Sequence, residues 1–500
     1  MGQIRKQTIQ SSFLSYIGFL VGAINTYFFT RQGLFTPDQY GLTQVFISMS
    51  QILAPLASFG MVAYMNKFFP YYFENLQDKK NDLLTVAVIF SLVGAALVFS
   101  GAFLFKPFVV QKFAKKSTQL VVEYYYWMLM FSFFYLCFII LESYLGTLKR
   151  TVLPNFMKET AYRIAVLLLI GLFAFRIINF GTFIVLFCCI YLLIVAIIVT
   201  YLFVTHQLHF SLQFSYISRR FRKKMATYVS FVYAGIVING IARQIDTLAL
   251  AGAKSLTDTG IYSLNQYIAA ILQVPYRGMQ AIGGALIAQH WKNKNKAEIE
   301  RIYKRSAINL LLLSMFLFFN IWLNYDDGLS LLHIEEKYAA GKTVFLILGI
   351  YNMLELGTGI NAAVISTSPA WRFEFYSGIL LLAISIPLNV FMARWRGMEG
   401  VALATFITFT IYNVVRLLFI KWRFNMWPFS MKTVYAILLT VSAYLAAYFI
   451  TYNMHGLLAM VIRSVIFSGA FLGGAYIMAL SPDFPELIAI IKNRLQKKTN

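Results

Sequence analysis

Charged side chains are scarce in this chain. Asp, Glu, Lys and Arg make up 13% of its 500 residues, whereas 59% of the residues are hydrophobic. A soluble domain carries about 25% charged residues to cover its surface, so the composition excludes an ordinary soluble protein. The aromatic share of 17%, with 47 Phe and 31 Tyr, suits lipid-facing surfaces and membrane interfaces. The composition therefore predicts an integral membrane protein.

Residues that carry metal and redox chemistry are also few. The three cysteines, Cys137, Cys188 and Cys189, lie in apolar runs, which favours buried thiols over a disulfide framework or a metal site. The five histidines lie at span ends or in loops, and the stretch HQLH has no neighbouring carboxylate. A nucleophile elbow, a zinc-protease motif and a GxxxxGK(S/T) phosphate loop are missing. We therefore expect no metal, no bound cofactor and no enzymatic chemistry.

Acidic residues are outnumbered by basic ones, 20 to 43, which gives a net charge of +23. A strongly basic protein can bind nucleic acid, but this chain has no soluble module of basic and aromatic residues to do so, and no nucleic-acid partner is expected. The positive-inside rule instead predicts that Lys and Arg gather in cytosolic loops. The strongest clusters are RRFRKK at Arg219–Lys224 and KNKNK at Lys292–Lys296.

Long apolar segments fill most of the chain. A spanning helix needs about 20 mainly apolar residues, and about fourteen segments satisfy this rule. They lie near 12–30, 41–65, 84–105, 120–146, 153–175, 180–204, 225–251, 259–290, 302–324, 339–366, 372–392, 398–420, 431–452 and 457–480. These segments predict an all-α polytopic membrane protein with two six-helix bundles and two additional C-terminal helices.

The distribution of Lys and Arg sets the expected orientation. With the N-terminus inside, roughly 27 of the 43 Lys and Arg fall in cytosolic segments, and the acidic stretches YDDG and IEEK fall outside. The loop KPFVVQKFAKK is an exception, because it carries four lysines on the external side. Both termini, including the basic tail IKNRLQKKTN, are predicted to be cytosolic. The external loops are short, about 15 residues at most, which excludes a large soluble domain.

The second and eighth predicted spans resemble each other. One begins with Gly41 and reaches Pro55 at mid-span, and the other begins with Gly260 and reaches Pro275. A proline inside a spanning helix frees a backbone carbonyl and permits a bend, so we predict hinges at both prolines. Transporters are commonly built from such repeats, with the substrate site between them. Chance similarity of two apolar helices is the alternative.

The repeat predicts how the chain is divided. An N-terminal six-helix bundle would cover residues 1–210 and a C-terminal six-helix bundle residues 211–424. Residues 425–500 would add two spanning helices and the basic tail. Because the chain points the same way after six spans, the repeat is expected to be parallel.

Several ionisable residues lie deep in predicted spans, where they are costly. Arg243 and Asp246 share one helix face and can partly neutralise each other. Arg277, two residues after Pro275, has no local acidic partner, and Glu355 is a second deep acid. Guanidinium groups bind phosphate in a bidentate manner, so these residues are candidates for a substrate cavity. A purely structural network of ion pairs is the alternative.

Other charged residues lie nearer to the span ends. Arg163 forms an i,i+4 pair with Glu159; we include Arg163 among the candidate cavity residues, with a structural role as the alternative. Four more lie within about one turn of an end, where a long side chain can reach the interface. We interpret these as structural: Glu123, Lys158, Arg416 and Arg463.

Three stretches resemble the polysaccharide flippases of bacterial surface-glycan pathways. They are LFTPDQYGLTQVFISMSQILAPLASFGMVAYMNKFFP, RQIDTLALAGAKSLTDTGIYSLNQYIAAILQVPYRGMQAI, and ISTSPAWRFEFYSGILLLAISIPLNVFMARWRGMEGVALATFITFTIYNVVRLLFI. Those flippases belong to the multidrug/oligosaccharidyl-lipid/polysaccharide exporter superfamily, whose members share two six-helix bundles around a central cavity. The resemblance covers most of the chain and consists of many weak matches.

The resemblance implies a carrier in the bacterial cytoplasmic membrane. Its substrate would be an undecaprenyl-diphosphate-linked oligosaccharide for O-antigen (lipopolysaccharide), capsule or exopolysaccharide synthesis. It would act by alternating access through a cationic cavity, with coupling to a proton or sodium gradient as an option. Arg243 and Arg277 would lie on the path of the diphosphate, and Asp246 would pair with Arg243 when the cavity is empty. The last two spans would form a groove for the lipid tail, as in lipid II flippases.

The implied partners are membrane lipids and the glycosyltransferases and glycan polymerase of the same pathway. Two other functions stay open. A cation-coupled multidrug antiporter of the same superfamily would favour acidic cavity residues such as Asp246 and Glu355. A membrane-embedded glycan polymerase or ligase would act on the same substrate, but it would be expected to carry a substantial external loop.

Overall fold

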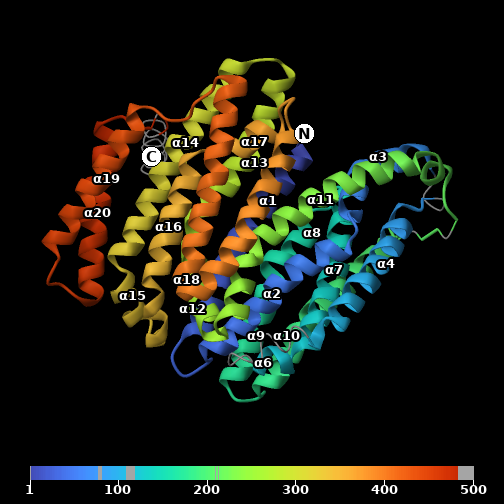
Figure 1. The fold of residues 1–500 in the computed structure, drawn as a ribbon, viewed down its shortest axis with the longest axis horizontal. Helices are drawn as coiled ribbons and strands as arrows, with labels where there is room; N and C mark the ends of the chain where they lie inside the picture. The colour runs from blue at the N-terminus through green and yellow to red at the C-terminus, as the bar shows by residue number, and fades with distance from the viewer. Residues whose placement is uncertain are drawn as a thin grey trace, which may run out of the picture. The chain divides into compact units, whose positions relative to one another are not determined.

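The computed structural model describes residues 2–76, 81–107, 119–208, 210–211, 213–481 and 483. These ranges are mainly α-helical and contain no β-strand (Figure 1). Most of the lysine-rich loop KPFVVQKFAKK and the whole basic tail lie outside the described residues. The predicted positions of both on opposite sides of the membrane therefore stay predictions.

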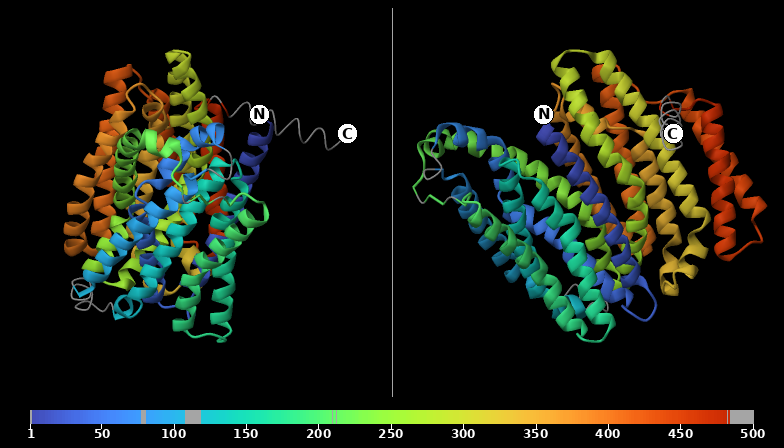
Figure 2. Two further views of the ribbon diagram at one scale, coloured as in Figure 1. Left: turned by 90° about the vertical axis from the view of Figure 1, so that its right-hand side faces the viewer. Right: turned by 180° about the vertical axis from the view of Figure 1, so that it is seen from behind.

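The chain forms two compact units, Met1–Gly260 and Ile261–Asn500. Within the first unit α2, α7 and α10 pack side by side, and within the second α14, α16 and α18 do so (Figures 1 and 2). The helices of the first unit are α1 (Gly2–Thr30), α2 (Pro37–Ala57), α3 (Met61–Asn75), α4 (Leu83–Leu104), α6 (Gln119–Glu123), α7 (Tyr125–Thr147), α8 (Val152–Asn155), the π-helix η2 (Phe156–Ala161), α9 (Tyr162–Ala174), α10 (Phe180–Val204) and α11 (Tyr216–Ala253).

Helix α12 (Leu256–Ala270) begins in the first unit and ends in the second. The second unit continues with the 3₁₀-helix η3 (Ile271–Gln273), α13 (Val274–Lys292), α14 (Lys296–Leu323), α15 (Tyr325–Leu331), the 3₁₀-helix η4 (Glu336–Gly341), α16 (Lys342–Gly357), α17 (Asn361–Ser366), α18 (Arg372–Phe424), α19 (Met431–Ile450) and α20 (Gly456–Ile477). The first compact unit extends through α11, beyond the predicted boundary at residue 210, because α11 packs against α2 and α3. The division into 1–210, 211–424 and 425–500 stays a prediction from the repeat.

The protein is a multi-pass membrane protein. Among the described residues, nine helices are long and apolar enough to cross a membrane, or up to ten if the bent pair α2 and α3 forms one span. Each of the predicted segments overlaps a helical element, although several are broken into two or three pieces. The count of fourteen and the cytosolic termini stay predictions.

Helix α18 is a helical hairpin in which two predicted spans meet without a loop. Gly397 has φ 61° and ψ −134°, a conformation that a residue with a side chain rarely adopts. The chain therefore turns back at this glycine. The rings of Phe373 and Phe419 stack with centroids 3.7 Å apart, and Arg416 pairs with Glu374 at 2.9 Å. Since the Arg416 side chain is buried, its prediction as a residue that reaches the interface was wrong.

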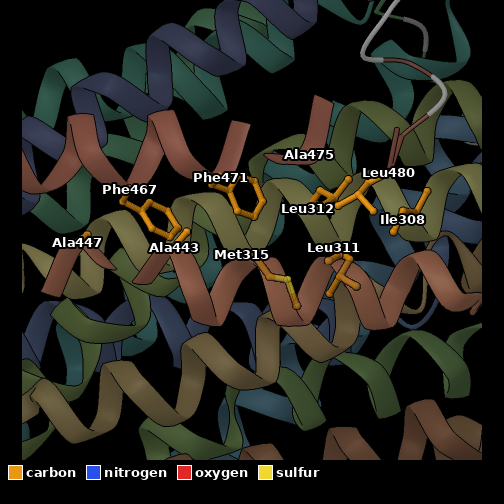
Figure 3. Close-up of a cluster of buried hydrophobic side chains, with 11 residues drawn as sticks. Ile308, Leu311, Leu312, Met315, Ala443, Ala447, Phe467, Phe471, Ala475 and Leu480 are labelled. Atoms are coloured by element: carbon orange, nitrogen blue, oxygen red, sulfur yellow. The ribbon is translucent and has the colours of Figure 1, made fainter. Parts of the chain in front are cut away.

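The two C-terminal helices pack against α14 through a buried apolar cluster (Figure 3). Ala443 and Ala447 let α19 approach closely, while Phe467 and Phe471 from α20 fill the space beside Met315. Lipid tails are as apolar as these side chains, so helices in a membrane associate mainly by close packing and by polar contacts rather than by exclusion of water. The outward faces of α19 and α20 expose many large apolar side chains, as expected of helices that contact lipid.

Arg463 supplies the polar contacts that hold this pair of helices in place. Its guanidinium donates to Asp327 of α15 at 2.5 Å, to the carbonyl of Leu323 at 3.2 Å, to Thr451 Oγ1 at 3.2 Å and to the carbonyl of Met454. One side chain thus binds the ends of α14 and α19 and the short helix α15. The Arg463 and Asp327 side chains are only 11% and 14% exposed. The prediction that Arg463 simply reaches the interface was therefore wrong.

The pKa of Asp327 is held below its ordinary value. Burial alone would raise it, but the Gly456 N–H and the Arg463 guanidinium outweigh that effect. A carboxylate with a depressed folded-state pKa stabilises the fold above its unfolded pKa of about 3.9 and loses this contribution as the pH falls through the folded pKa. The attachment of α19 and α20 should therefore weaken only under strongly acidic conditions.

We predict that Asp327→Asn lowers the free energy of unfolding by about 2 kcal/mol, less than the cost of breaking a fully buried pair because both side chains keep some exposure. Thermal unfolding in detergent, followed by intrinsic fluorescence, measures the effect. The free energy of unfolding of this variant should also depend less on pH under strongly acidic conditions, because the Asp327 carboxyl group is gone. Arg301→Gln is the control, since Arg301 forms an exposed pair with Glu298 and its loss should change little. Equal effects of the two substitutions would contradict the role assigned to Arg463.

Candidate functional site

The starts of α2 and α12 cross at two glycines. A Cβ added at Gly41 would lie 2.2 Å from the carbonyl oxygen of Leu256, and a Cβ at Gly260 would lie 2.3 Å from the carbonyl oxygen of Pro37. No larger residue fits either position unless the backbones separate. The two contacts are equivalent under the repeat. The number of residues between Gly41 and Gly260 is the same as the number between Pro37 and Leu256.

A hydrogen bond also joins equivalent positions of the two predicted repeats. Thr257 Oγ1 donates to Asp38 Oδ1 at 2.7 Å, across a sequence separation of 219 residues. The same separation relates Gly41 to Gly260. Equivalent residues of the two predicted repeats thus touch one another, as they do at a local two-fold axis. The crossing agrees with the repeat inferred from the sequence.

Polar side chains also join α2 to α11. Gln244 Nε2 donates to Gln51 Oε1 at 2.6 Å, and Tyr233 Oη donates to the carbonyl oxygen of Leu56 at 2.6 Å. Both contacts lie within one turn of Pro55, whose missing N–H leaves the Gln51 carbonyl without its helical partner. The α2–α11 contact therefore includes amide and hydroxyl groups close to Pro55.

The bend of this span lies just after Pro55. Helix α2 continues through the proline to Ala57, and α3 then departs at an angle of 48°. Ser58 closes the turn, since its N–H and Oγ donate to the Pro55 carbonyl at 3.2 and 2.7 Å. Gly60 follows with φ 73°, and a Cβ there would lie 2.8 Å from the Cβ of Tyr233. Whether this bend moves during function, as predicted for Pro55, stays a prediction.

Arg243 and Asp246 occupy different environments on α11. The Asp246 side chain is buried, at 5% exposure, and its Oδ1 accepts from the Thr247 N–H at 2.7 Å and from Thr247 Oγ1 at 3.4 Å. Arg243 is exposed, and it forms no ion pair with another described residue. The predicted neutralisation of Arg243 by Asp246 therefore stays a prediction.

The corresponding proline of the second unit follows a change of helix type. The 3₁₀-helix η3 separates α12 from α13, and Pro275 lies in the first turn of α13. The carbonyl of Ala269, just before η3, accepts from Asn352 Nδ2 at 3.1 Å. A side-chain amide from α16 thus satisfies a backbone group at the helix break, as a broken helix in a membrane requires.

Glu355 lies one turn after Asn352 on α16 and faces the same break. Its Oε2 accepts from Gln273 Nε2 at 3.0 Å and from Tyr351 Oη at 2.7 Å, and Gln273 also donates to Asn352 Oδ1 at 2.7 Å. The side chain is half-buried, and no Lys or Arg of the described ranges pairs with it. Glu355 is therefore a carboxylate held by neutral donors.

Arg277 lies two residues after Pro275 and is exposed. Like Arg243, it has no acidic partner within the part of the chain that the structure describes. Arg243 belongs to the first unit and Arg277 to the second. The structure thus places Glu355 beside the helix break that precedes Pro275. Arg243 and Arg277 are exposed cations, one in each unit.

Arg163 belongs to a different cluster, around the π-helix η2. It pairs with Glu159 at 3.2 Å, and Lys158 pairs with Glu142 of α7 at 3.1 Å. The carbonyl of Arg163 also accepts from Asn25 Nδ2 at 2.8 Å. The two ion pairs balance the charge of the cluster, so Lys158 links two helices and does not simply reach the interface as predicted.

Five polar residues of these sites were missed by sequence reasoning, which considered only ionisable groups. They are Gln51, Gln244, Gln273, Tyr351 and Asn352. The available signal was the presence of amide side chains in apolar segments near a proline, where a freed backbone carbonyl needs a donor. No group of three or more His, Cys, Asp or Glu side chains suited to a metal ion occurs among the described residues.

The arrangement of helices is that of the flippase and multidrug exporter superfamily predicted from the sequence. The lipid II flippase MurJ in an inward closed conformation matches with a TM-score of 0.71 and 16% sequence identity, over 96% of this chain and 100% of that one. An inward-facing multidrug resistance transporter of the MATE family, of the MOP superfamily, matches with a TM-score of 0.59 and 14% identity, over 83% and 94% of the two chains.

A MOP superfamily transporter from Pyrococcus furiosus matches with a TM-score of 0.59 and 13% identity, over 84% and 96% of the chains. No protein-family model matches the sequence, and neither does any curated protein. At these identities the likeness establishes the fold alone. The matched proteins are flippases and transporters rather than enzymes, in agreement with the expectation of a transport protein.

We predict that Gly41→Ala or Gly260→Ala disrupts the α2–α12 crossing and lowers stability by about 1–3 kcal/mol, the usual cost of overpacking. Thermal unfolding in detergent measures the loss. Gly171→Ala in α9 is the matched control, because a Cβ there meets nothing within 4 Å. Variants at Gly41 and Gly260 that unfold like the control variant would contradict the close contact of the two helices.

Proposed function

We propose that this protein moves a lipid-linked oligosaccharide across the bacterial cytoplasmic membrane. The substrate is an undecaprenyl-diphosphate-linked oligosaccharide, destined for a surface polysaccharide such as O-antigen, capsule or exopolysaccharide. The observation that carries this proposal is that Arg243 and Arg277, both deep in predicted spans, are exposed and have no acidic partner among the described residues. The likeness to a lipid II flippase supports it, because that protein is named for a lipid-linked substrate.

The chemistry of the substrate explains why exposed arginines are useful. A diphosphate carries negative charge that cannot enter a membrane without compensation, and guanidinium groups offer paired donors that match phosphate oxygens. An exposed arginine in a spanning segment is costly unless it lines an aqueous path or meets a ligand. Arg243 and Arg277 therefore act as binding positions for the diphosphate along its path.

The helix breaks provide places where the spans can bend during transport. The Ser58–Gly60 turn follows Pro55, and η3 precedes Pro275, so each repeat has one break within a few residues of its proline. At each break a side-chain donor from a neighbouring helix satisfies a backbone carbonyl, Tyr233 in one case and Asn352 in the other. These breaks act as hinges in an alternating-access cycle, with the Gly41–Gly260 crossing as a fixed contact.

Glu355 provides a site for coupling to an ion gradient. No Lys or Arg of the described residues balances this half-buried carboxylate, so a coupling cation can bind it without competition from a side chain of the protein. Exchange of that ion would alter the bonds from Gln273 and Tyr351. Since Gln273 belongs to η3, a change at Glu355 is transmitted directly to the break before Pro275.

A cation-coupled multidrug antiporter is the second candidate. Glu355 favours it, because an accessible carboxylate also attracts a cationic drug, and the MATE transporters share the fold. The two exposed arginines favour the flippase, because they would repel such a substrate. A glycan polymerase or ligase has no comparable support, since the proteins that share the fold are not enzymes.

We predict that Arg243→Gln or Arg277→Gln slows flipping of a diphosphate-linked lipid oligosaccharide about tenfold, because a hydrogen bond to a charged group is worth about 1.5–3 kcal/mol. Lysine at either position should restore only part of the rate, since it keeps the charge but not the paired donors. Purified protein in liposomes, with the sidedness and the mass of the lipid measured together, provides the test. The mass should stay unchanged.

The control variant for this experiment is Arg372→Gln, which removes an exposed arginine at the start of α18. It should transport at the wild-type rate. Normal transport by the Arg243→Gln and Arg277→Gln variants would exclude a diphosphate path through these residues. Efflux of cationic dyes, without movement of the lipid, would support the antiporter instead.

We predict that Glu355→Gln abolishes the response of transport to an imposed proton or sodium gradient while leaving slow, gradient-independent flipping. The amide retains the bonds to neighbouring donors in part but cannot take up a proton or hold a cation. Initial rates in liposomes with and without each gradient measure the response. Glu336→Gln, at an exposed position at the start of η4, should respond like wild type. A gradient response that survives in Glu355→Gln would place the coupling site elsewhere.

A further inference from the structure

We propose that the ends of α3 and α11 form a docking surface for the headgroups of anionic phospholipids. This surface, called the α3–α11 patch, combines the five cations of residues 219–224 with exposed aromatic side chains of both helices. It lies outside the predicted path of the transported substrate and does not depend on the proposed function. It rests on the predicted orientation, in which this part of the chain faces the cytosol.

The first observation is the density of exposed positive charge. All five cations are exposed, and they lie within six consecutive positions at the start of α11: Arg219, Arg220, Arg222, Lys223 and Lys224. In the described residues none of them pairs with an acidic side chain. A cluster of four to eight Lys and Arg directly beside a spanning helix attracts anionic lipid, by an amount that falls off within a Debye length.

The second observation is a set of exposed aromatic side chains beside these cations. Phe214 and Tyr216 precede the basic run, and Tyr71 and Phe73 lie at the end of α3. The two groups are adjacent, because the rings of Tyr71 and Phe221 lie with centroids 6.4 Å apart. Aromatic rings prefer the interfacial region of a bilayer, where their apolar faces meet the acyl boundary. Cations alone would bind any anion, whereas cations beside exposed aromatic rings are typical of a surface that binds a membrane.

The third observation is that the patch is held in a fixed arrangement. Asp82 is fully buried, and its Oδ2 accepts from the Ser215 N–H at 2.9 Å and from Ser218 Oγ at 2.7 Å. Ser218 Oγ is hydrogen-bonded in turn to Tyr72 Oη at 2.6 Å. These bonds fix the start of α11 to the end of α3. A preformed surface binds with a smaller entropic cost than a mobile basic tail.

The fourth observation is the length of α11. It has 38 residues, whereas a bilayer core is crossed by about 20. Its apolar part follows the basic run, so the run projects beyond the hydrocarbon region and the patch lies at the level of the headgroups. A free phosphate ion or a soluble polyanion could reach the cations, but neither would make use of the aromatic side chains.

The other strong basic cluster offers a matched comparison. Lys292, Lys294 and Lys296 are exposed, but the neighbouring Trp291 is only partly exposed and donates its Nε1–H to the Val364 carbonyl at 3.2 Å. The KNKNK cluster thus has fewer exposed aromatic side chains beside it in the sequence than the α3–α11 patch. We expect it to bind anionic lipid more weakly than the α3–α11 patch.

The test uses the full-length protein in detergent, titrated with phosphatidylglycerol or with phosphatidylcholine of the same acyl chains and observed by native mass spectrometry. Wild type should retain phosphatidylglycerol preferentially. The triple variant Arg219→Gln, Arg222→Gln, Lys223→Gln should lose about a hundredfold in apparent affinity for phosphatidylglycerol, with no change for phosphatidylcholine. The control triple Lys292→Gln, Lys294→Gln, Lys296→Gln removes the same charge and should have a much smaller effect.

Two further arms separate lipid from other anions and from misfolding. Tyr71→Ala with Phe73→Ala should weaken phosphatidylglycerol binding while all five cations remain, and inorganic phosphate at millimolar concentration should not displace the lipid. Thermal unfolding close to that of wild type shows that each variant is folded. Equal losses from the two triple variants, unchanged binding in the aromatic variant, or displacement by phosphate would each overturn the proposal.

Discussion

The structure depends on one constraint: inside a membrane every backbone and charged group needs a partner within the protein. Water is not available to a broken helix there, and an unpaired polar group costs several kcal/mol. At the break before Pro275 an amide from α16 binds the carbonyl of Ala269. At the break after Pro55 a tyrosine hydroxyl from α11 binds the carbonyl of Leu56. Both of these breaks are thus accompanied by a side-chain donor from another helix.

The same constraint divides the charged residues into two groups. Arg416 is buried and its ion pair joins the two arms of α18, while the largely buried Arg463 pairs with Asp327 of α15. Arg243 and Arg277 are exposed, and Glu355 is held only by neutral donors. Because a buried pair satisfies its own charge, it has little capacity left for a substrate. The residues without such a pair remain available for an anionic ligand or a coupling ion.

At the glycine crossing, equivalent positions of the two predicted repeats contact each other. Gly41 and Gly260 occupy equivalent positions, and each admits the backbone of the other repeat where a Cβ would not fit. Asp38 and Thr257, also equivalent, differ in chemistry and form a donor–acceptor pair at 2.7 Å. Two identical acidic residues at this place would repel one another. The divergence of the repeats at this position therefore stabilises the contact between them.

The sequence by itself determined the membrane class and the helical architecture, and it indicated two prolines that lie within a few residues of helix breaks. Those features follow from the length of apolar runs and from the restrictions of proline and glycine, which act locally. The two spans that meet at Gly397 were recognised in the same way. Resemblance to the exporter superfamily indicated the fold, which the matched structures confirm.

Only the tertiary structure decided which charges are paired. Arg463 and Asp327 are separated by 136 residues and Arg416 and Glu374 by 42, so no local spacing rule could connect them. Residues judged structural because they lie near span ends proved to link helices, and Glu355 proved to share its environment with Gln273. The physical reason is that the partner of a charged or amide group is chosen by helix packing, which brings together residues that are far apart in the chain.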